Sequence, residues 1–329
     1  MKTFLGVDGG GTKTRFLLID QAGKVLATHL EGPAYYLEIG LDRLREMLAR
    51  GIGETLRQAR VREEELGYAF LGLPAYGEDS GLLPALDAAP LQALPHRRYR
   101  CGNDMVCGWA GALAGADGIN IVAGTGSIAY GEYAGRNARA GGWGELFSDE
   151  GSSYWLAREG LRLFSRMSDG RLPRGPLHEQ VRRHFALQSD LDLCAAIYGK
   201  DIAQRSRFAQ LSKLVAAAAA EGDRAALGLL EAAARELAEM IDAVRGQLQI
   251  PAGASIPVSS SGGMFQPGNG LREALRCELQ RRSAQYRFTE AQLPPDMGAV
   301  IQAARLGGTP LSADSVAALA RAASRVRGP

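Results

Sequence analysis

The alternation of apolar runs and glycine-rich turns divides the first thirty residues into short strands. Apolar and β-branched residues fill positions 3–8, 14–20 and 25–28, and the glycines of residues 9–12 interrupt the first two runs. Glycine turns between such runs are typical of antiparallel strands. The chain is therefore predicted to begin with an antiparallel meander.

The next part of the chain alternates between helical and strand-like patterns. Apolar positions recur every three or four residues from Leu41 to Leu56, which predicts an amphipathic helix. Buried strands are predicted at residues 68–73 and 99–101. The small residues that follow Asp104 predict a closely packed helix.

A strand, a glycine turn and a second strand recur over residues 118–133. Aligning Gly11 with Gly126 places Thr12 against Ser127, so both halves show a strand, a glycine loop with a hydroxyl, and a strand. This repeat predicts two domains built on one plan, with a boundary near residue 115.

The second half of the sequence is mainly helical. A third junction between a strand and glycines stands at residues 256–263, and a further strand is predicted at 286–291. Helices are predicted at residues 152–167, 176–187, 208–220, 224–248, 296–306 and 313–325. We expect a first domain over 1–115, a second over 116–306 and a C-terminal helix over 307–329.

Composition excludes several classes of protein. The 329 residues include 38 Lys+Arg and 36 Asp+Glu, and a net charge of +2 does not favour a nucleic-acid partner. The four cysteines are scattered, which fits reduced thiols, and the four histidines show no metal-ligand spacing. The longest apolar stretch, residues 105–116, is too short to cross a membrane, and no secretory segment is seen. We expect a cytoplasmic protein without a membrane partner.

The three glycine junctions are the strongest chemical signal. Glycine turns let backbone N–H groups approach an anion closely, so each junction could hold phosphate or could simply be a hairpin turn. No Gly-Lys-Ser/Thr tripeptide occurs at these loops, and no helix follows the first glycines, which sets aside the Walker and dinucleotide motifs. Lys13 could face phosphate or solvent.

Two aspartates follow strands beside these loops. Asp8 ends the first strand and could hold Mg²⁺ through water, or could cap the turn. Asp104 could be a helix N-cap, or a general base that accepts a hydroxyl proton in phosphoryl transfer.

Residues 141–152 (GGWGELFSDEGS) contain a tryptophan flanked by glycines. The indole face of Trp143 suits the apolar side of a sugar ring. Asp149 could accept hydrogen bonds from sugar hydroxyls, or could cap the helix that starts near Ser152. These two roles are compatible.

Three ordered motifs resemble the BadF/BadG/BcrA/BcrD ATPase family and its N-acetylglucosamine kinase branch. They are residues 6–14 (GVDGGGTKT), 122–127 (VAGTGS) and 141–152, and the similarity spans nearly the whole chain. The resemblance implies an α/β fold of two ribonuclease-H-like domains, as in actin and hexokinase, with a central cleft for ATP and sugar. It also implies a small-molecule sugar substrate, a cytoplasmic kinase and a possible homodimer.

The resemblance assigns roles to individual residues. It implies Asp104 as the catalytic base that also contacts the sugar, and Asp8 near Mg²⁺. The implied phosphate- and ATP-binding residues are Gly10, Gly11, Thr12, Lys13, Gly124, Thr125, Gly126, Ser127, Gly262 and Gly263. The implied sugar-binding residues are Thr125, Gly142, Trp143 and Asp149, and Ala217 and Ala218 fall in the stretch that flanks adenine.

Three positions depart from the family pattern. Tyr35, Ile128 and Ala140 replace an Asn, an Asn and a Cys that are common at these places in the branch. The resemblance therefore implies ATP use more firmly than the identity of the sugar. We expect phosphorylation of N-acetyl-D-glucosamine at its 6-hydroxyl, with glucosamine as the alternative substrate.

Two other functions are weighed. An energy-coupling ATPase of the same family would need cysteines for an iron–sulfur cluster, and no Cys adjoins residues 124–127. A silent sensor of ATP or sugar would not need both Asp8 and Asp104.

Overall fold

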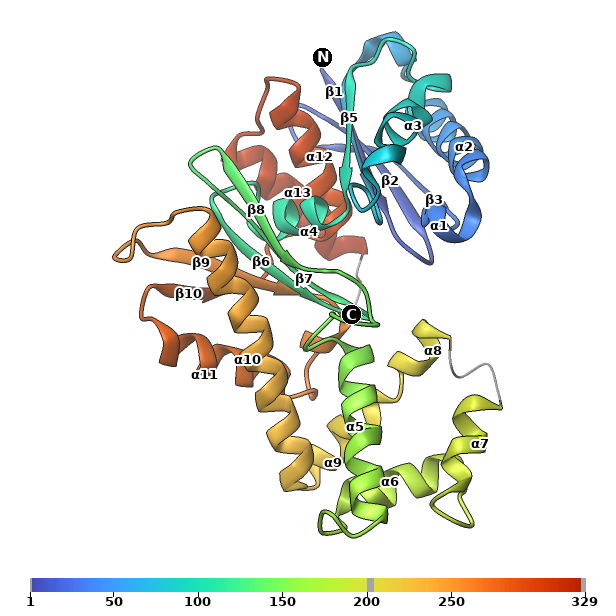
Figure 1. Ribbon diagram of the computed structural model, residues 1–329. Helices are drawn as coiled ribbons and strands as arrows, with labels where there is room; N and C mark the ends of the chain where they lie inside the picture. Colours follow the sequence, from blue (N-terminus) through green and yellow to red (C-terminus); the bar gives the residue numbers. More distant parts are fainter. Residues whose placement is uncertain (1, 200–203, 327–329) are drawn as a thin grey trace. The chain divides into compact units, whose positions relative to one another are not determined.

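The computed structural model describes residues 2–199 and 204–326, and within these ranges two five-stranded mixed sheets form the framework (Figure 1). Contacts divide the chain into unit 1, residues 1–116 with 290–329, and unit 2, residues 117–289. Each unit contains one of the sheets. The expected α/β architecture is confirmed.

The sheet of unit 1 has the strand order β3-β2-β1-β4-β5. Strands β1 to β3 are antiparallel, and β4 and β5 extend the sheet in parallel with β1. The strands are β1 (Thr3–Gly9), β2 (Thr14–Asp20), β3 (Val25–Glu31), β4 (Leu66–Leu73) and β5 (Tyr99–Asn103). The predicted meander is confirmed.

Helices cover the sheet of unit 1 because their apolar faces need burial. In α2 the residues Leu44, Leu48 and Ile52 are fully buried against the sheet, as their spacing predicts. The helices are α1 (Tyr36–Ile39), α2 (Leu41–Ala59), α3 (Leu83–Ala88), α4 (Met105–Ala112), α12 (Pro295–Leu306) and α13 (Ala313–Val326). Short 3₁₀ turns lie at η1 (Glu63–Glu65), η2 (Ser80–Leu82) and η3 (Ala89–Gln92).

The sheet of unit 2 repeats the plan with the order β10-β9-β6-β7-β8. Strands β6 to β8 are antiparallel, and β9 and β10 run parallel to β6. The strands are β6 (Gly118–Ala123), β7 (Ser127–Tyr133), β8 (Arg136–Gly141), β9 (Ile256–Ser261) and β10 (Tyr286–Thr289). The faint sequence repeat therefore corresponds to two sheets with the same order and strand directions.

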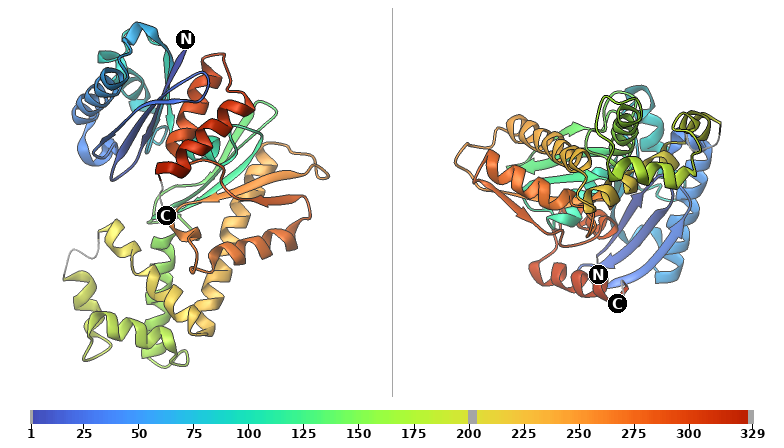
Figure 2. Two further views of the ribbon diagram at one scale, coloured as in Figure 1. Left: turned by 180° about the vertical axis from the view of Figure 1, so that it is seen from behind. Right: turned by 90° about the horizontal axis from the view of Figure 1, so that it is seen from below.

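Unit 2 contains seven described helices and one described 3₁₀ turn. Helix α10 packs along β7 and β8, and Figure 2 shows it beside this sheet from two further sides. The helices are α5 (Ser153–Ser168), α6 (Pro176–Phe185), α7 (Asp192–Tyr198), α8 (Arg205–Ala209), α9 (Ser212–Ala220), α10 (Arg224–Gln247) and α11 (Leu271–Arg282). The 3₁₀ turn is η5 (Gly263–Phe265).

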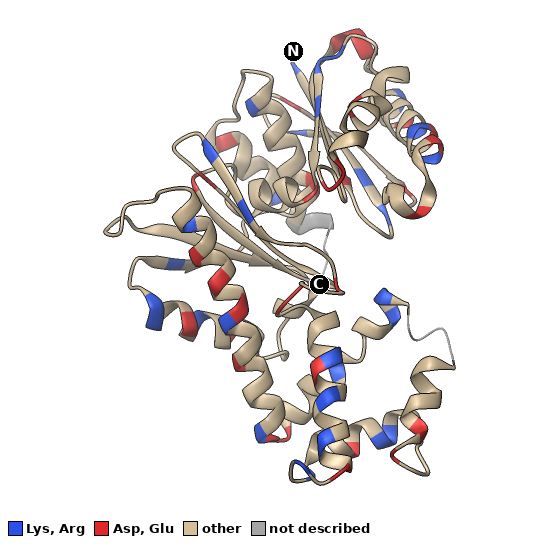
Figure 3. Cartoon of the chain, viewed as in Figure 1, with Lys and Arg blue, Asp and Glu red and all other residues tan. Residues whose placement is uncertain are grey.

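The sequence patterns miss three features of unit 2, one of which is the short helix α7. Residues 208–220 are not one helix, because α8 and α9 are separated at Gln210 and Leu211. Helix α11 is also missed, although its buried Leu271, Leu275 and Leu279 recur every four residues. Basic and acidic residues between these leucines obscure the pattern, and Figure 3 shows both charges along the helices of this unit.

Residues 290–306, which we expected in the second domain, belong to unit 1. Helix α12 packs against α4 and β1. A Cβ at Gly298 would lie 2.0 Å from the Cys107 carbonyl oxygen, and one at Gly6 would lie 2.5 Å from the Val300 nitrogen. Backbones this close hold α12 to unit 1. Of the C-terminal helix expected over 307–329, α13 covers Ala313–Val326, and residues 327–329 lie outside the described ranges.

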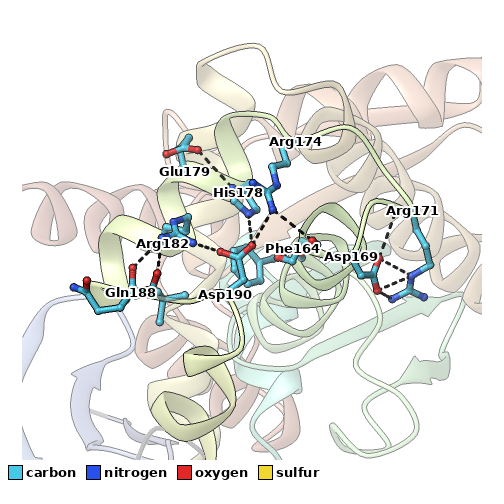
Figure 4. Close-up of polar contacts among 11 residues, drawn as sticks. Phe164, Asp169, Arg171, Arg174, His178, Glu179, Arg182, Gln188 and Asp190 are labelled. Carbon is cyan, nitrogen blue, oxygen red and sulfur yellow. Dashed lines mark hydrogen bonds and ion pairs between the residues drawn. The ribbon is translucent and has the colours of Figure 1, made fainter.

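A buried polar cluster supports α6 in unit 2 (Figure 4). His178 is stacked on Phe164 at 5.0 Å, and its Nε2 lies 3.0 Å from Asp190 Oδ2. Arg182 also donates to Asp190, and the His178 hydrogen bond is the main cause that lowers the pKa of Asp190 to about 2. His184 on the same helix is exposed, so it lies on a different face from the buried His178. None of the described helices combines the length and apolarity that a membrane span requires.

The close packing of α12 yields a first prediction. Gly298→Ala is expected to lower the free energy of unfolding by about 2–3 kcal/mol, because the new methyl group collides with the backbone of α4. Gly228→Ala, at an exposed position in the second turn of α10 where a Cβ would meet nothing within 4 Å, should instead stabilise by ~0.5–1 kcal/mol. Urea unfolding measures both. Equal effects of the two variants would contradict the packing.

Candidate functional site

The carboxyl ends of three parallel strands in unit 1 place two aspartates at one edge of the sheet. Asp8 in β1 pairs with Gly72 in β4, which pairs with Gly102 in β5, two residues before Asp104. A Cβ at Gly72 would lie 3.2 Å from the Asp104 Cα, so the Asp104 backbone comes close to β4 beside Asp8, and the charge of Asp104 contributes to the raised pKa of Asp8. The parallel register thus brings together two of the predicted site residues.

The first glycine loop connects β1 to β2 at the same edge. The Ala34 N–H donates to the Gly10 carbonyl at 2.9 Å, which ties the loop to the segment before α1. Thr12 and Lys13 are exposed. A Cβ at Gly11 would meet no atom within 4 Å, so packing does not require glycine there. The space beside Gly11 is open to a ligand.

Asp104 is not the side chain that caps α4. The Met105 N–H donates to Asn103 Oδ1 at 3.1 Å, and the Asp104 side chain makes no capping hydrogen bond. Asp104 therefore stands at the N-cap position of α4, as predicted, but its side chain does not make the capping hydrogen bond. Burial, with a smaller effect from the Glu78 charge, raises the pKa of Asp104 to about 6. A carboxyl group with this pKa can accept a proton near neutral pH.

Asp8 has a strongly raised pKa. Burial is the largest cause, the charges of Asp104 and Asp296 add to it, and Arg15 and Lys13 oppose it, so that the pKa is about 8. Asp296 lies at the start of α12, where its Oδ2 is 3.6 Å from Arg15 Nη1. Asp296 is not predicted from the sequence, because no local pattern connects it with β1.

These carboxylates fit a divalent cation that is held through water. Oxygen ligands suit Mg²⁺, and its charge would relieve the repulsion that raises the pKa of Asp8. In residues 2–199 and 204–326, no three His, Cys, Asp or Glu side chains are close enough to hold an ion by themselves.

In unit 2 the second glycine loop lies beside the third glycine junction. Strands β6 and β9 are parallel with Val122 opposite Ser261, so both strands end at the same edge of the sheet. Gly262 has φ +105°, and a Cβ there would lie 2.3 Å from the Ala123 carbonyl oxygen. Gly262 is therefore required for this close pairing.

A cavity of about 290 Å³ opens where these two junctions meet. Its size is near the lower end of the range for small-molecule sites. The lining residues are Gly124, Thr125, Ser153, Ala209, Gln210, Ser212, Lys213, Ala216, Gly263, Met264 and Asn269. Thus the predicted residues Gly124, Thr125 and Gly263 share one pocket with the start of α9. Within the alanine run Ala216 lines the pocket, whereas Ala218 is buried in the core.

Two predicted residues of the second loop, Gly126 and Ser127, have structural roles. Ser127 is buried, and its hydroxyl donates to the Glu150 carbonyl at 2.6 Å. Gly126 has no room for a side chain, because a Cβ would lie 2.8 Å from Asp149 Oδ2. Thr125 is exposed beside the pocket. The Ser127 hydroxyl therefore binds within the protein and does not face a ligand, whereas the Thr125 side chain is exposed at the pocket.

The predicted sugar-binding segment, residues 141–152, begins at the end of β8 and is called the sugar loop below. Trp143 is 67% exposed, and the Arg139 guanidinium lies 5.7 Å from its ring centroid. One face of the indole is therefore covered by a cation, and the ring still offers a large exposed surface. Gly142 rests on Ile128, whose Cδ1 would be 2.7 Å from a Cβ at position 142. Ile128, one of the three positions that differ from the family pattern, therefore packs against the sugar loop.

Asp149 is buried within unit 2 and both its oxygens have partners. Oδ1 accepts from the Ser127 N–H at 3.3 Å, and Oδ2 accepts from Arg205 Nη2 at 2.6 Å. Burial raises the pKa of Asp149, and Arg205 opposes the shift. The cap of α5 is Ser152, whose hydroxyl accepts from the Trp155 N–H at 3.2 Å. The capping interpretation of Asp149 is wrong, and Arg205 is a partner that the sequence analysis missed.

Comparison with known proteins gives a consistent result. The profile of the BadF/BadG/BcrA/BcrD ATPase family matches residues 5–303. N-acetyl-D-glucosamine kinase from Dictyostelium discoideum is 26% identical, and the match covers 91% of this chain and 97% of the relative. N-acetylmuramic acid/N-acetylglucosamine kinase from Clostridium acetobutylicum is 28% identical, covering 92% of this chain and 98% of the relative.

A solved structure shares the fold. It is that of a candidate N-acetylglucosamine kinase from Chromobacterium violaceum, 28% identical, with a TM-score of 0.68. The match covers 91% of this chain and 98% of that structure. The two repeated sheets are thus those of the actin-like ATPase fold, as the resemblance implies.

The raised pKa of Asp8 yields a prediction for the ligand-free protein. Between about pH 4 and pH 8 the folded protein keeps a proton on Asp8 that the unfolded chain has lost, so the free energy of unfolding falls as the pH rises. Asp8→Asn removes this dependence and should stabilise the protein by ~1–3 kcal/mol at pH 8. Urea unfolding at pH 5 and pH 8 measures the difference.

A control separates this effect from any loss of charge. The Asp42 side chain is 91% exposed, and Asp42→Asn should keep the pH dependence of the wild type. If Asp8→Asn also kept the wild-type dependence, the raised pKa of Asp8 would not be its cause.

Proposed function

The chain belongs to the BadF/BadG/BcrA/BcrD ATPase family, and from that premise we propose that it is an amino-sugar kinase. It transfers the γ-phosphoryl group of ATP to the 6-hydroxyl of N-acetyl-D-glucosamine. The relatives from Dictyostelium and Clostridium support this substrate by their names. Glucosamine is the alternative acceptor. N-acetylmuramic acid is a further candidate acceptor, because the name of the Clostridium relative includes it.

One observation carries the proposal. Gly124 and Thr125 of the second loop line the same cavity as Gly263 of the third junction. A nucleotide needs such an arrangement, with backbone N–H groups for phosphates beside a pocket for the nucleoside. Thr125 and Lys213 add a hydroxyl and a positive charge at this pocket. We assign the pocket to ATP.

The glycines around the pocket and the first loop then have two kinds of role. Gly124, Gly263 and Gly11 have open space where a Cβ would be, so their backbones can meet phosphates or the nucleoside. Gly126 and Gly262 are required by packing, and they shape the loops instead. In this proposal Gly10, Thr12 and Lys13 complete the first phosphate loop. Ser127 contributes by holding the second loop to Glu150.

Asp104 is proposed as the general base. Its pKa of about 6 keeps the carboxylate mostly ionised at neutral pH and still able to take the hydroxyl proton. As the proton leaves, the sugar oxygen attacks the γ-phosphorus in line with the leaving ADP. Trp143 would stack on the sugar ring, and Gly142, Thr125 and Asp149 would belong to the sugar site. Asp104 belongs to unit 1, and the pocket belongs to unit 2.

Mg²⁺ is the proposed cofactor, with Asp8 as the residue that would hold it through water. Bound there, the ion would neutralise charge that develops on the phosphoryl oxygens. We further propose that the protein works in the cytoplasm as a homodimer, without nucleic-acid or membrane partners. Light scattering of the purified protein tests the dimer.

A panel of acceptors tests the function. ADP release is measured with N-acetylglucosamine, glucosamine, N-acetylmuramic acid and no sugar. Preference for N-acetylglucosamine supports the proposal, and preference for glucosamine supports the alternative. ADP release that no sugar stimulates, together with iron in anaerobically purified protein, would favour the energy-coupling ATPase. Binding of sugar or ATP without turnover would favour a sensor.

Asp104→Asn is expected to lower kcat by about 10²–10⁴-fold, because the amide cannot accept the proton. ATP binding should be nearly unchanged. For the wild type, kcat should rise with pH around 6, where Asp104 ionises. Steady-state kinetics across pH and calorimetry with ATP measure these effects. A variant with wild-type turnover would remove Asp104 from the mechanism.

Gly124→Ala is expected to weaken ATP binding at least tenfold while the free energy of unfolding stays within ~1 kcal/mol of the wild type. The methyl group meets no protein atom within 4 Å and would occupy space that the ligand needs. Gly246→Ala, equally open but at the far end of α10, is the matched control. If both variants bind ATP like the wild type, the pocket is not the nucleotide site.

A further inference from the structure

Arg205 joins helix α8 to the loop that follows β8. It is the first residue of α8, and its Nη2 donates to Asp149 Oδ2 at 2.6 Å. Its Nε lies 3.0 Å from Glu145 Oε2. Both carboxylates belong to the proposed sugar loop, so a single guanidinium holds two points of that loop.

The ion pair extends to the second phosphate loop. Asp149 has φ +61°, an uncommon conformation for a residue with a side chain, and its side chain is only 3% exposed. Its second oxygen accepts from the Ser127 N–H at 3.3 Å. A Cβ at Gly126 would lie 2.7 Å from Arg205 Nη2, so the loop has a glycine where the pair packs against it.

Helix α8 is also part of the nucleotide pocket. Ala209 at its end and Gln210 after it line the cavity. Phe208 packs on Tyr154 with ring centroids 4.8 Å apart, and the Tyr154 N–H donates to the Thr125 carbonyl at 3.3 Å. Because α8 has only five residues, its position depends on these side-chain contacts and on Arg205.

We propose that Arg205 is a positioning residue that couples the nucleotide pocket to the sugar loop. Through Asp149 and Glu145 it orders the sugar loop and the second phosphate loop, and through α8 it sets one wall of the pocket. This inference rests on the proposed function. It assigns a role to a residue that none of the family motifs contains.

The chemistry of arginine suits this role. Its planar guanidinium presents several donors in a fixed geometry, so that it can bind two carboxylates at once. A lysine has one compact charge and would satisfy one carboxylate better than both. Arg205 also supplies the counter-charge that Asp149 needs in its buried position.

Arg205→Met keeps much of the length and removes the charge. We expect it to weaken ADP binding about tenfold, measured by calorimetry without sugar, because the pocket wall loses its anchor. The KM for the sugar should also rise, with a smaller change in kcat, since Arg205 is not among the residues that line the pocket and acts through the sugar loop. Arg205→Lys should recover part of the ADP affinity.

Arg171→Met is the matched control. Arg171 pairs with Asp169 on the exposed surface of the same unit, away from the pocket residues. This variant should bind ADP like the wild type. Thermal unfolding of each variant shows whether it is folded, and Arg205→Lys carries the comparison if Arg205→Met does not fold.

A double variant tests the route through Asp149. If Arg205 acts through this carboxylate, then Asp149→Asn and Arg205→Met together should weaken ADP binding by less than the product of their separate effects. Independent effects would overturn the proposed route.

The outcomes separate this inference from the proposed function. Wild-type ADP affinity in a folded Arg205→Met variant would overturn the positioning role. If the wild type binds ADP normally but phosphorylates no sugar, the proposed kinase function is wrong. The ADP affinities of wild type and Arg205→Met would still test the positioning role of Arg205. A wild type that binds no ADP would overturn both.

Discussion

The parallel pairing of β6 with β9 is the interaction on which the nucleotide pocket depends. The two strands come from distant parts of the chain, and their pairing brings Gly262 against the Ala123 carbonyl, where a side chain would collide. A glycine at this point lets the two backbones approach, and both strands then end at the same edge. Gly124 and Gly263 meet in one cavity for this reason.

In unit 1 the same order of strands brings acidic side chains close together. Its parallel strands bring Asp8 and Asp104 to one edge, and α12 adds Asp296. Crowded and partly buried carboxylates cost stability in the ligand-free protein, as the raised pKa values of Asp8 and Asp104 indicate. Such a cost is common where side chains are arranged for chemistry instead of for stability.

Glycine has two different physical roles in these loops. Gly126 and Gly262 are necessary because neighbouring protein atoms occupy the place of a side chain. Gly11, Gly124 and Gly263 have free space there, so packing within the protein does not explain them. The sequence shows the same letter in both cases. Only the surrounding atoms distinguish a structural glycine from one that faces a ligand.

The sequence by itself determined most strands and most long helices of both units, their common plan and the loops that carry Asp8, Asp104, Gly124 and Gly263. These depend on local periodicity and turn residues. Tertiary structure alone decided that α12 joins unit 1, that the Ser127 hydroxyl donates to the Glu150 carbonyl, and that Arg205 holds Asp149. These are contacts between residues far apart in the chain. Their partners are chosen by the packing of whole elements, which no local pattern contains.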